Sequence, residues 1–134
     1  MLQPRKEKFR KHFNPKLTGV ATRAYKVAMG DFGLQSLQRS WLTARQIEAA
    51  RKTIVREMKR KGKLWLRVFP DRPITSKPNE VGMGKGKGDV DQYVFALKPG
   101  RVMFEIGGVS EEIAREAFRK AAQKLPVKTK FLSK

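Results

Sequence analysis

Residues 43–62 read TARQIEAARKTIVREMKRKG and predict a helix with a clear beginning and a clear end. Thr43 followed by Gln46 is a capping box, in which each residue's side chain satisfies a backbone N–H of the other. Apolar residues recur at helical spacing at positions 47, 50, 54 and 58, so the helix has one face to bury. Gly62 can adopt the left-handed conformation that commonly ends a helix. The cations before it would interact favourably with the negative, C-terminal end of the helix dipole.

Strands and a second helix are predicted around this element. Ser110 precedes two glutamates and an alanine-rich stripe, which predicts a capped helix that Pro126 ends. Alternating apolar residues predict five strands, at 24–29, 64–69, 92–97, 101–106 and 127–132. The strands at 92–97 and 101–106 flank Lys-Pro-Gly, which is typical of a hairpin turn. The predicted fold is α+β, with two helices packed on one mixed or antiparallel sheet.

The composition restricts the possible partners. A chain of 134 residues is long enough for one core, which predicts a single domain over residues 1–134. Its 31 Lys and Arg against 12 Asp and Glu give a formal net charge of +19. Such an excess opposes compaction unless a polyanion balances it, and nucleic acid is the commonest polyanion. An anionic membrane surface is the next candidate.

A membrane partner is nevertheless not expected. No run of eighteen apolar residues occurs, and the basic N-terminus contains no apolar segment of signal-peptide length. The second helix carries mostly alanine on its apolar side, where a membrane-bound helix needs bulky residues. The absence of cysteine excludes disulfides and thiolate metal sites. We therefore expect a soluble intracellular protein.

Residues 70–91 show neither helical nor strand periodicity and predict one long extended loop. Prolines stiffen its start, and the run GMGKGKG (82–88) removes side-chain bulk at its tip. A P-loop is excluded, because Val81 stands where its first glycine belongs and Gly88 where Ser or Thr is required. Bare backbone N–H groups and two ammonium groups favour contact with a phosphate chain. The plainer alternative is a disordered, solvated linker that contacts no partner.

Residues 1–24 predict a basic arm, in which Phe9 and Phe13 interleave with the cations, so part of the arm is expected to pack. Catalytic chemistry has little support, because no nucleophile, general base and orienting group converge. We expect no catalytic residue, metal or cofactor. Two alternatives stay open: an enzyme of RNA processing or phosphoryl transfer that uses Asp89 and Asp91 with a metal, and a sequence-tolerant DNA-compacting protein.

Five segments in order resemble the family of ribosomal protein sixteen of the bacterial and organellar large subunit. They are TARQIEAAR (43–51), RVFPDRPIT (67–75), MGKGKG (83–88), KPGRVMFE (98–105) and AAQKLPVKTKF (121–131). The resemblance covers essentially the whole chain. It implies a hammerhead-type α+β fold, no enzymatic activity, and a structural place in the large subunit, in a bacterial cytoplasm or an organelle matrix. It further implies contacts to large-subunit rRNA, neighbouring ribosomal proteins, and tRNA at the aminoacyl site near the peptidyl transferase centre, with the peptidyl site a further candidate.

The predicted contacts to rRNA and tRNA are basic residues in three places. The resemblance implies loop contacts at Arg72, Lys77, Lys85, Gly86 and Lys87, and arm contacts at Arg5, Lys6, Lys8, Arg10, Lys11 and His12. The charge pattern adds Lys59, Arg60 and Lys61, a run that with Lys63 is expected to extend a basic surface, the plainer alternative being a solvated helix end. Arg67 is a further candidate contact. Two departures from the family occur. Gly82 replaces an arginine that some bacteria hydroxylate, and the arm continues as FNPKLTG after its histidine.

Overall fold

The structure, a computed structural model, describes residues 2–5, 19–76 and 89–134. In these residues the chain forms two helices and seven strands, an α+β fold. The elements are β1 (Phe32–Ser36), β2 (Ser40–Thr43), α1 (Ala44–Glu57), β3 (Lys63–Leu66), β4 (Arg72–Ser76), β5 (Asp89–Leu97), β6 (Val102–Gly107), α2 (Glu111–Ala122) and β7 (Thr129–Ser133).

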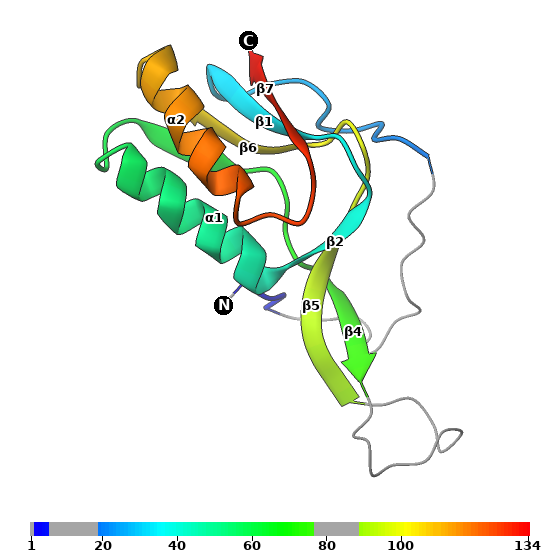
Figure 1. Cartoon of the computed structure of the whole chain (residues 1–134). Helices are drawn as coiled ribbons and strands as arrows, with labels where there is room; N and C mark the ends of the chain where they lie inside the picture. Colours follow the sequence, from blue (N-terminus) through cyan, green and yellow to red (C-terminus); the bar gives the residue numbers. More distant parts are fainter. Residues whose placement is uncertain (1, 6–18, 77–88) are drawn as a thin grey trace.

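The strands form two antiparallel sheets, where the sequence predicted one. The larger sheet has the order β3-β6-β1-β7 and the smaller one the order β2-β5-β4. Helices α1 and α2 pack on each other and lie together on one side of the larger sheet (Figure 1). Strands β4 and β5 extend away from this body, in the direction where the described chain stops at Ser76 and resumes at Asp89 (Figure 1).

The predicted capping box of α1 is confirmed. The Gln46 N–H donates to Thr43 Oγ1 at 3.2 Å, and the Thr43 N–H donates to Gln46 Oε1 at 3.0 Å. The predicted apolar face is buried in the core (Ile47, Ala50, Ile54 and Met58). The helix ends at Glu57 rather than beside Gly62, because Lys59 and Arg60 already adopt left-handed φ angles of 53° and 63°.

The core lies between the helices and the larger sheet. Helix α2 begins after Ser110, as predicted, and buries Ala114, Ala117, Phe118 and Ala121. The Phe118 ring meets the Phe131 ring of β7 edge to face, with the ring centroids 6.0 Å apart. Burying a side chain of this size contributes about 1.5–3 kcal/mol, so these contacts hold α2 on the sheet.

The predicted hairpin of residues 92–97 and 101–106 is wrong. Both strands exist, but β5 pairs with β2 and β4, whereas β6 pairs with β1 and β3. The turn that joins them instead bonds to the end of β1. The Gly100 N–H donates to the Ser36 carbonyl, and the Ser36 N–H donates to the Arg101 carbonyl, both at 2.8 Å. The chain therefore passes from one sheet to the other at this turn.

Other predicted boundaries change for identifiable reasons. Residues 24–29 form no strand, since the N–H groups of residues 28–30 bond to a side chain instead of a neighbouring strand. The prediction of a strandless loop over 70–91 is wrong at both ends, where β4 pairs with β5. Pro73 is tolerated in β4 because this is an edge strand. Strands β1 and β2 were not predicted, and the GMGKGKG run lies outside the described residues.

Candidate nucleic-acid interface

The predicted contact residues divide into two groups. Nine of them lie outside the described residues: Lys6, Lys8, Arg10, Lys11, His12, Lys77, Lys85, Gly86 and Lys87. The other six are described: Arg5, Lys59, Arg60, Lys61, Arg67 and Arg72. Asp89 and Asp91, which the enzyme alternative requires, lie at the start of β5, and the structure describes their backbone alone.

A basic turn, Lys59–Lys61, follows α1. All three side chains are exposed, and none forms an ion pair with a carboxylate of the described residues. Backbone bonds hold the turn, with the Arg60 N–H donating to the Val55 carbonyl at 3.3 Å and the Lys61 N–H to the Met58 carbonyl at 3.0 Å. A left-handed conformation costs an L-residue other than glycine about 1–2 kcal/mol. The chain thus presents two cations where glycine would fit with less strain.

Arg5 and Arg72 are also exposed, but they come from other parts of the chain. Arg72 begins β4, where its backbone lies opposite Val94 of β5. Arg5 closes the short described N-terminal segment, whose Leu2 packs against the core. At least the beginning of the predicted arm therefore packs on the body. Neither arginine forms an ion pair within the described part of the chain.

Arg67 lies in a different environment, because its guanidinium pairs with the carboxylate of Glu105. The Arg67 side chain is 21% exposed, and that of Glu105 is fully buried. Glu105 Oε1 also accepts the N–H groups of Ala28, Met29 and Gly30, at 2.9, 2.7 and 2.9 Å. This one carboxylate therefore ties β6 to residue 67 and to the segment before β1.

The hydrogen bonds keep Glu105 ionised. Burial by itself would raise the pKa of this carboxyl, but the N–H groups of Gly30 and Met29, the Arg67 guanidinium and the Ala28 N–H together hold the pKa below its usual value. Arg67 and Glu105 thus form a neutral pair, and little of Arg67 is left for an external anion. Sequence reasoning missed Glu105, although an acid within an otherwise apolar strand is a signal that a partner must exist.

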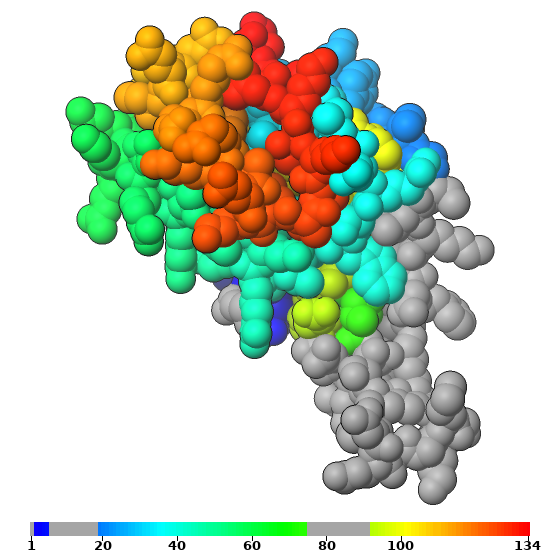
Figure 2. Space-filling view, viewed as in Figure 1, coloured from blue at the N-terminus to red at the C-terminus, as the bar shows by residue number. Residues whose placement is uncertain are grey.

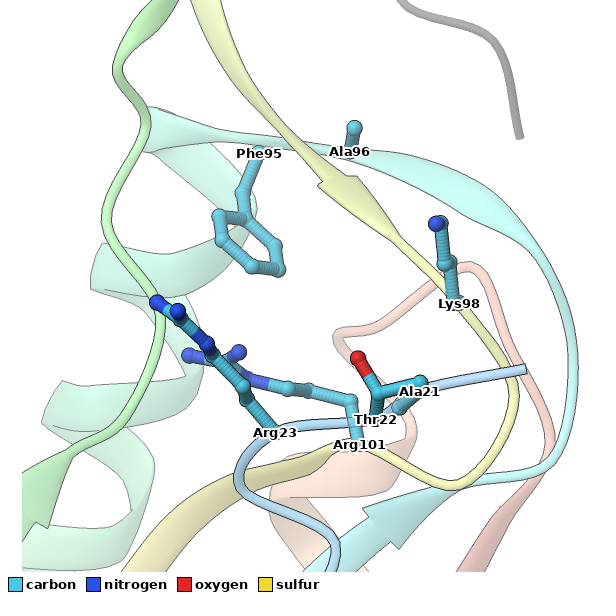
Figure 3. A pocket seen from close by; sticks show the side chains of 7 residues that line it. All are labelled: Ala21, Thr22, Arg23, Phe95, Ala96, Lys98 and Arg101. Carbon is cyan, nitrogen blue, oxygen red and sulfur yellow. The ribbon is translucent and has the colours of Figure 1, made fainter. Parts of the chain in front are cut away.

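A second cluster of cations was not among the predicted contacts. Arg23, Lys98 and Arg101 line one cavity of about 190 Å³ together with the ring of Phe95 (Figure 3). Arg101 Nη2 donates to the Arg67 carbonyl, and its guanidinium lies over the Phe95 ring, 5.0 Å from the ring centroid. Arg23 is far from the other two cations in the sequence, since it precedes β1, whereas Lys98 and Arg101 lie just before β6. Only the packing of these segments brings them together.

Most glutamates on the helices are already paired with cations. Four of the five glutamates on the helices form ion pairs with helix cations: Glu48 with Arg51, Glu57 with Lys120, Glu111 with Arg115, and Glu116 with Arg119. Figure 2 shows α1, α2 and β7 covering one face of the body. The basic turn, Arg5, Arg72 and the cavity cations have no such carboxylate partner among the described residues. Exposed cations without carboxylate partners are typical of proteins that bind a polyanion.

Comparison with known proteins identifies the family. The family model described as "Ribosomal protein L16p/L10e" matches residues 4–132. The large ribosomal subunit protein uL16 of Delftia acidovorans is 58% identical over 134 residues, which is 100% of this chain and 97% of the relative. The uL16 proteins of an Acidovorax species (59% identical) and of Halorhodospira halophila (56%) align over 100% of this chain and over 97% and 98% of their own lengths. The chain therefore belongs to the ribosomal protein L16p/L10e family.

Membership in this family settles one of the open alternatives. The chain is a ribosomal protein and not an enzyme, so the metal-dependent alternative at Asp89 and Asp91 is set aside. The resemblance noted in the sequence is confirmed over nearly the whole chain. Within the described residues, neither helix is long and apolar enough to cross a membrane.

Proposed function

We propose that this chain binds large-subunit rRNA as a structural constituent of the bacterial large ribosomal subunit and contacts tRNA at the aminoacyl site. The observation that carries the proposal is the cationic surface without carboxylate partners, found in a member of a ribosomal protein family. The family's bacterial relatives agree with a place in the ribosomes of the cytoplasm. Neighbouring ribosomal proteins are the other partners expected there.

The arrangement of charge supports a mechanism based on the RNA backbone. A-form RNA hides its base edges in a deep, narrow major groove, so a folded protein reaches chiefly phosphates, riboses and loops. Exposed lysines and arginines suit this, because each phosphate that they neutralise releases counterions. Four helix glutamates already form ion pairs with helix cations, whereas the basic turn, Arg5 and Arg72 have no carboxylate partner among the described residues and are available to RNA. We assign the basic turn, Arg5 and Arg72 to this role.

The tRNA contact rests on the loop and the arm. Strands β4 and β5 project from the body, and this projection supports a contact beyond the reach of the body itself (Figure 1). We propose that Lys85 and Lys87, with Gly86 between them, approach RNA phosphates at this tip, and that Lys77 assists. The arm cations Lys6, Lys8, Arg10, Lys11 and His12 are proposed as further contacts.

Salt dependence tests the rRNA proposal directly. The affinity of the full chain for a large-subunit rRNA fragment is measured over a range of KCl concentrations, for the wild type and for Lys85→Ala/Lys87→Ala. The slope of log K against log salt should become shallower by up to ~1.5 units if both lysines contact phosphates. Arg119→Ala/Lys124→Ala removes the same formal charge from the end of α2 and should leave the slope unchanged.

Two results would contradict the proposal. Equal slopes for the wild type and the loop variant would remove the loop tip from the interface. Equal affinity for duplex DNA and for the rRNA fragment would favour a sequence-tolerant DNA-compacting protein instead. The tRNA contact is tested separately, by binding of aminoacyl-site tRNA to ribosomes that carry Lys85→Ala/Lys87→Ala; unchanged tRNA affinity would refute it.

A further inference from the structure

The cavity beside the turn between β5 and β6 is built from three segments. Arg23 and Thr22 come from the chain before β1, Phe95 from β5, and Lys98 and Arg101 from the turn itself (Figure 3). Two backbone bonds hold the first segment in place. The Ala21 N–H donates to the Pro99 carbonyl at 2.9 Å, and the Val102 N–H donates to the Ala24 carbonyl at 2.5 Å. The cavity is therefore part of the folded body.

Arg101 has donor capacity that the described protein does not use. Its Nη2 donates to the Arg67 carbonyl, whereas its Nε is buried and has no hydrogen-bond partner. A buried donor without an acceptor is costly, and a native structure usually supplies the acceptor in some form. Burial lowers the pKa of Arg101, and the positive charge of Arg67 lowers it further. The negative charge of an anion in the cavity would oppose both effects on the pKa of Arg101.

The lining selects the chemistry of the occupant. Three cations and the Thr22 hydroxyl offer donors, and the described residues that line the cavity include no carboxylate. An oxyanion can accept from all of these groups, while the donor groups of a nucleobase would find few acceptors. The cavity volume of about 190 Å³ is well above the roughly 10–15 Å³ that a single water needs, so a phosphate group has room in it.

We propose that this cavity binds one phosphodiester group of the RNA backbone, with Arg101, Arg23 and Lys98 as its ligands. This proposal rests on the proposed rRNA binding and adds to it a defined binding site for one phosphate of the RNA. Arg101 lies against Phe95 and is held by the Arg67 carbonyl, so its guanidinium is already oriented before RNA arrives. Arg23 is exposed and has no ion-pair partner among the described residues, so its side chain is available to a bound phosphate.

The first experiment observes the Arg101 Nε–H by NMR in the full-length protein. Inorganic phosphate and a short single-stranded oligoribonucleotide are titrated separately, with sodium chloride at equal ionic strength as the control. We expect the Arg101 Nε–H signal and the amides of Phe95 and Lys98 to move with both phosphate compounds and not with chloride. If none of these signals moves with either compound, the cavity is not a phosphate site. If phosphate alone moves them, the site takes a free anion and the RNA part of the proposal is wrong.

The second experiment uses substitutions at the rim. Arg23→Gln should weaken binding of the oligoribonucleotide about tenfold, the loss expected from one charge-assisted hydrogen bond. Lys52→Gln, on the exposed side of α1, removes one charge outside the cavity and should change the affinity less than twofold. Because Arg23 forms no ion pair with a described residue, its substitution should not alter stability; thermal unfolding checks this. Equal affinities for the two variants would overturn the assignment of the cavity.

The two proposals fail in different ways. If the wild type binds the rRNA fragment with the expected salt dependence while Arg23→Gln behaves as Lys52→Gln does, the cavity is refuted and the proposed function stands. If the wild type does not bind the rRNA fragment but phosphate still moves the Arg101 signal, the anion site stands and the proposed function is refuted.

Discussion

Replacing Glu105 by Gln tests whether one buried carboxylate holds the segment before β1 and orients the arginines beside the cavity. The substitution preserves the shape of the side chain and removes its charge. Arg67 then keeps a guanidinium that is 21% exposed and has lost its only ion-pair partner among the described residues. The N–H groups of residues 28–30 retain an acceptor, but a neutral one.

The expected loss of stability follows from these contacts. Removing one partner of a buried ion pair costs about 3–5 kcal/mol. The partial exposure of Arg67 lowers this penalty, whereas weaker bonds from three N–H groups add to it. We expect the free energy of unfolding to fall by about 3 kcal/mol, a large share of the roughly 5–15 kcal/mol typical of a domain.

Urea unfolding followed by tryptophan fluorescence measures this loss. Trp65 lies opposite Glu105 in the pairing of β3 with β6, so its emission reports on the region that is perturbed. Glu112→Gln, an exposed substitution in the first turn of α2, is the control and should cost less than about 1 kcal/mol. A loss below about 1 kcal/mol for Glu105→Gln would refute the anchoring role.

The pH dependence gives a second check on the same reasoning. The pKa of Glu105 in the folded state lies below its ordinary value of 4.5. Its contribution is therefore fully present above about pH 4.5 and is lost as the pH falls through the lower folded-state pKa. The difference in free energy of unfolding between wild type and Glu105→Gln should therefore narrow as the pH falls from about 4.5 toward the folded-state pKa of Glu105. A difference that stays constant down to pH 2 would contradict the lowered pKa.

Three further substitutions test the fold and the interface. Thr43→Ala removes half of the capping box of α1 and should cost about 1 kcal/mol in urea unfolding. Phe118→Ala opens a cavity beneath α2 and should cost about 3–5 kcal/mol, with a visible fall in the thermal midpoint; a smaller loss would show that the site collapses. Arg60→Gly should raise stability by up to about 1 kcal/mol, because glycine relieves the φ of 63°, while rRNA affinity falls; a gain in stability with unchanged affinity would remove Arg60 from the interface.

Local signals in the sequence predicted the helices well. The capping residues, the buried stripes and the starts of α1 and α2 depend on residues within one or two turns of each other, so they can be read from spacing. The predicted end of α1 was four residues late, because the pattern of charges continued after the backbone had left the helix. The net charge and the family motifs pointed to the partner without any structure.

The sequence alone determined the class of fold, the excess of positive charge and the family, because these are properties of composition, local spacing and the order of motifs along one chain. Tertiary structure decided which strands pair and which cations are available. The hairpin between β5 and β6 failed for this reason, since strand partners are chosen by long-range packing and not by the turn alone. Glu105 lies 38 residues from Arg67 and 75 from Gly30 in the sequence, yet it bonds to both. Its burial and its neutralisation of the Arg67 charge therefore cannot be read from neighbouring residues in the sequence. The same long-range contacts place Arg23 beside Arg101, and this proximity exists only in the folded chain.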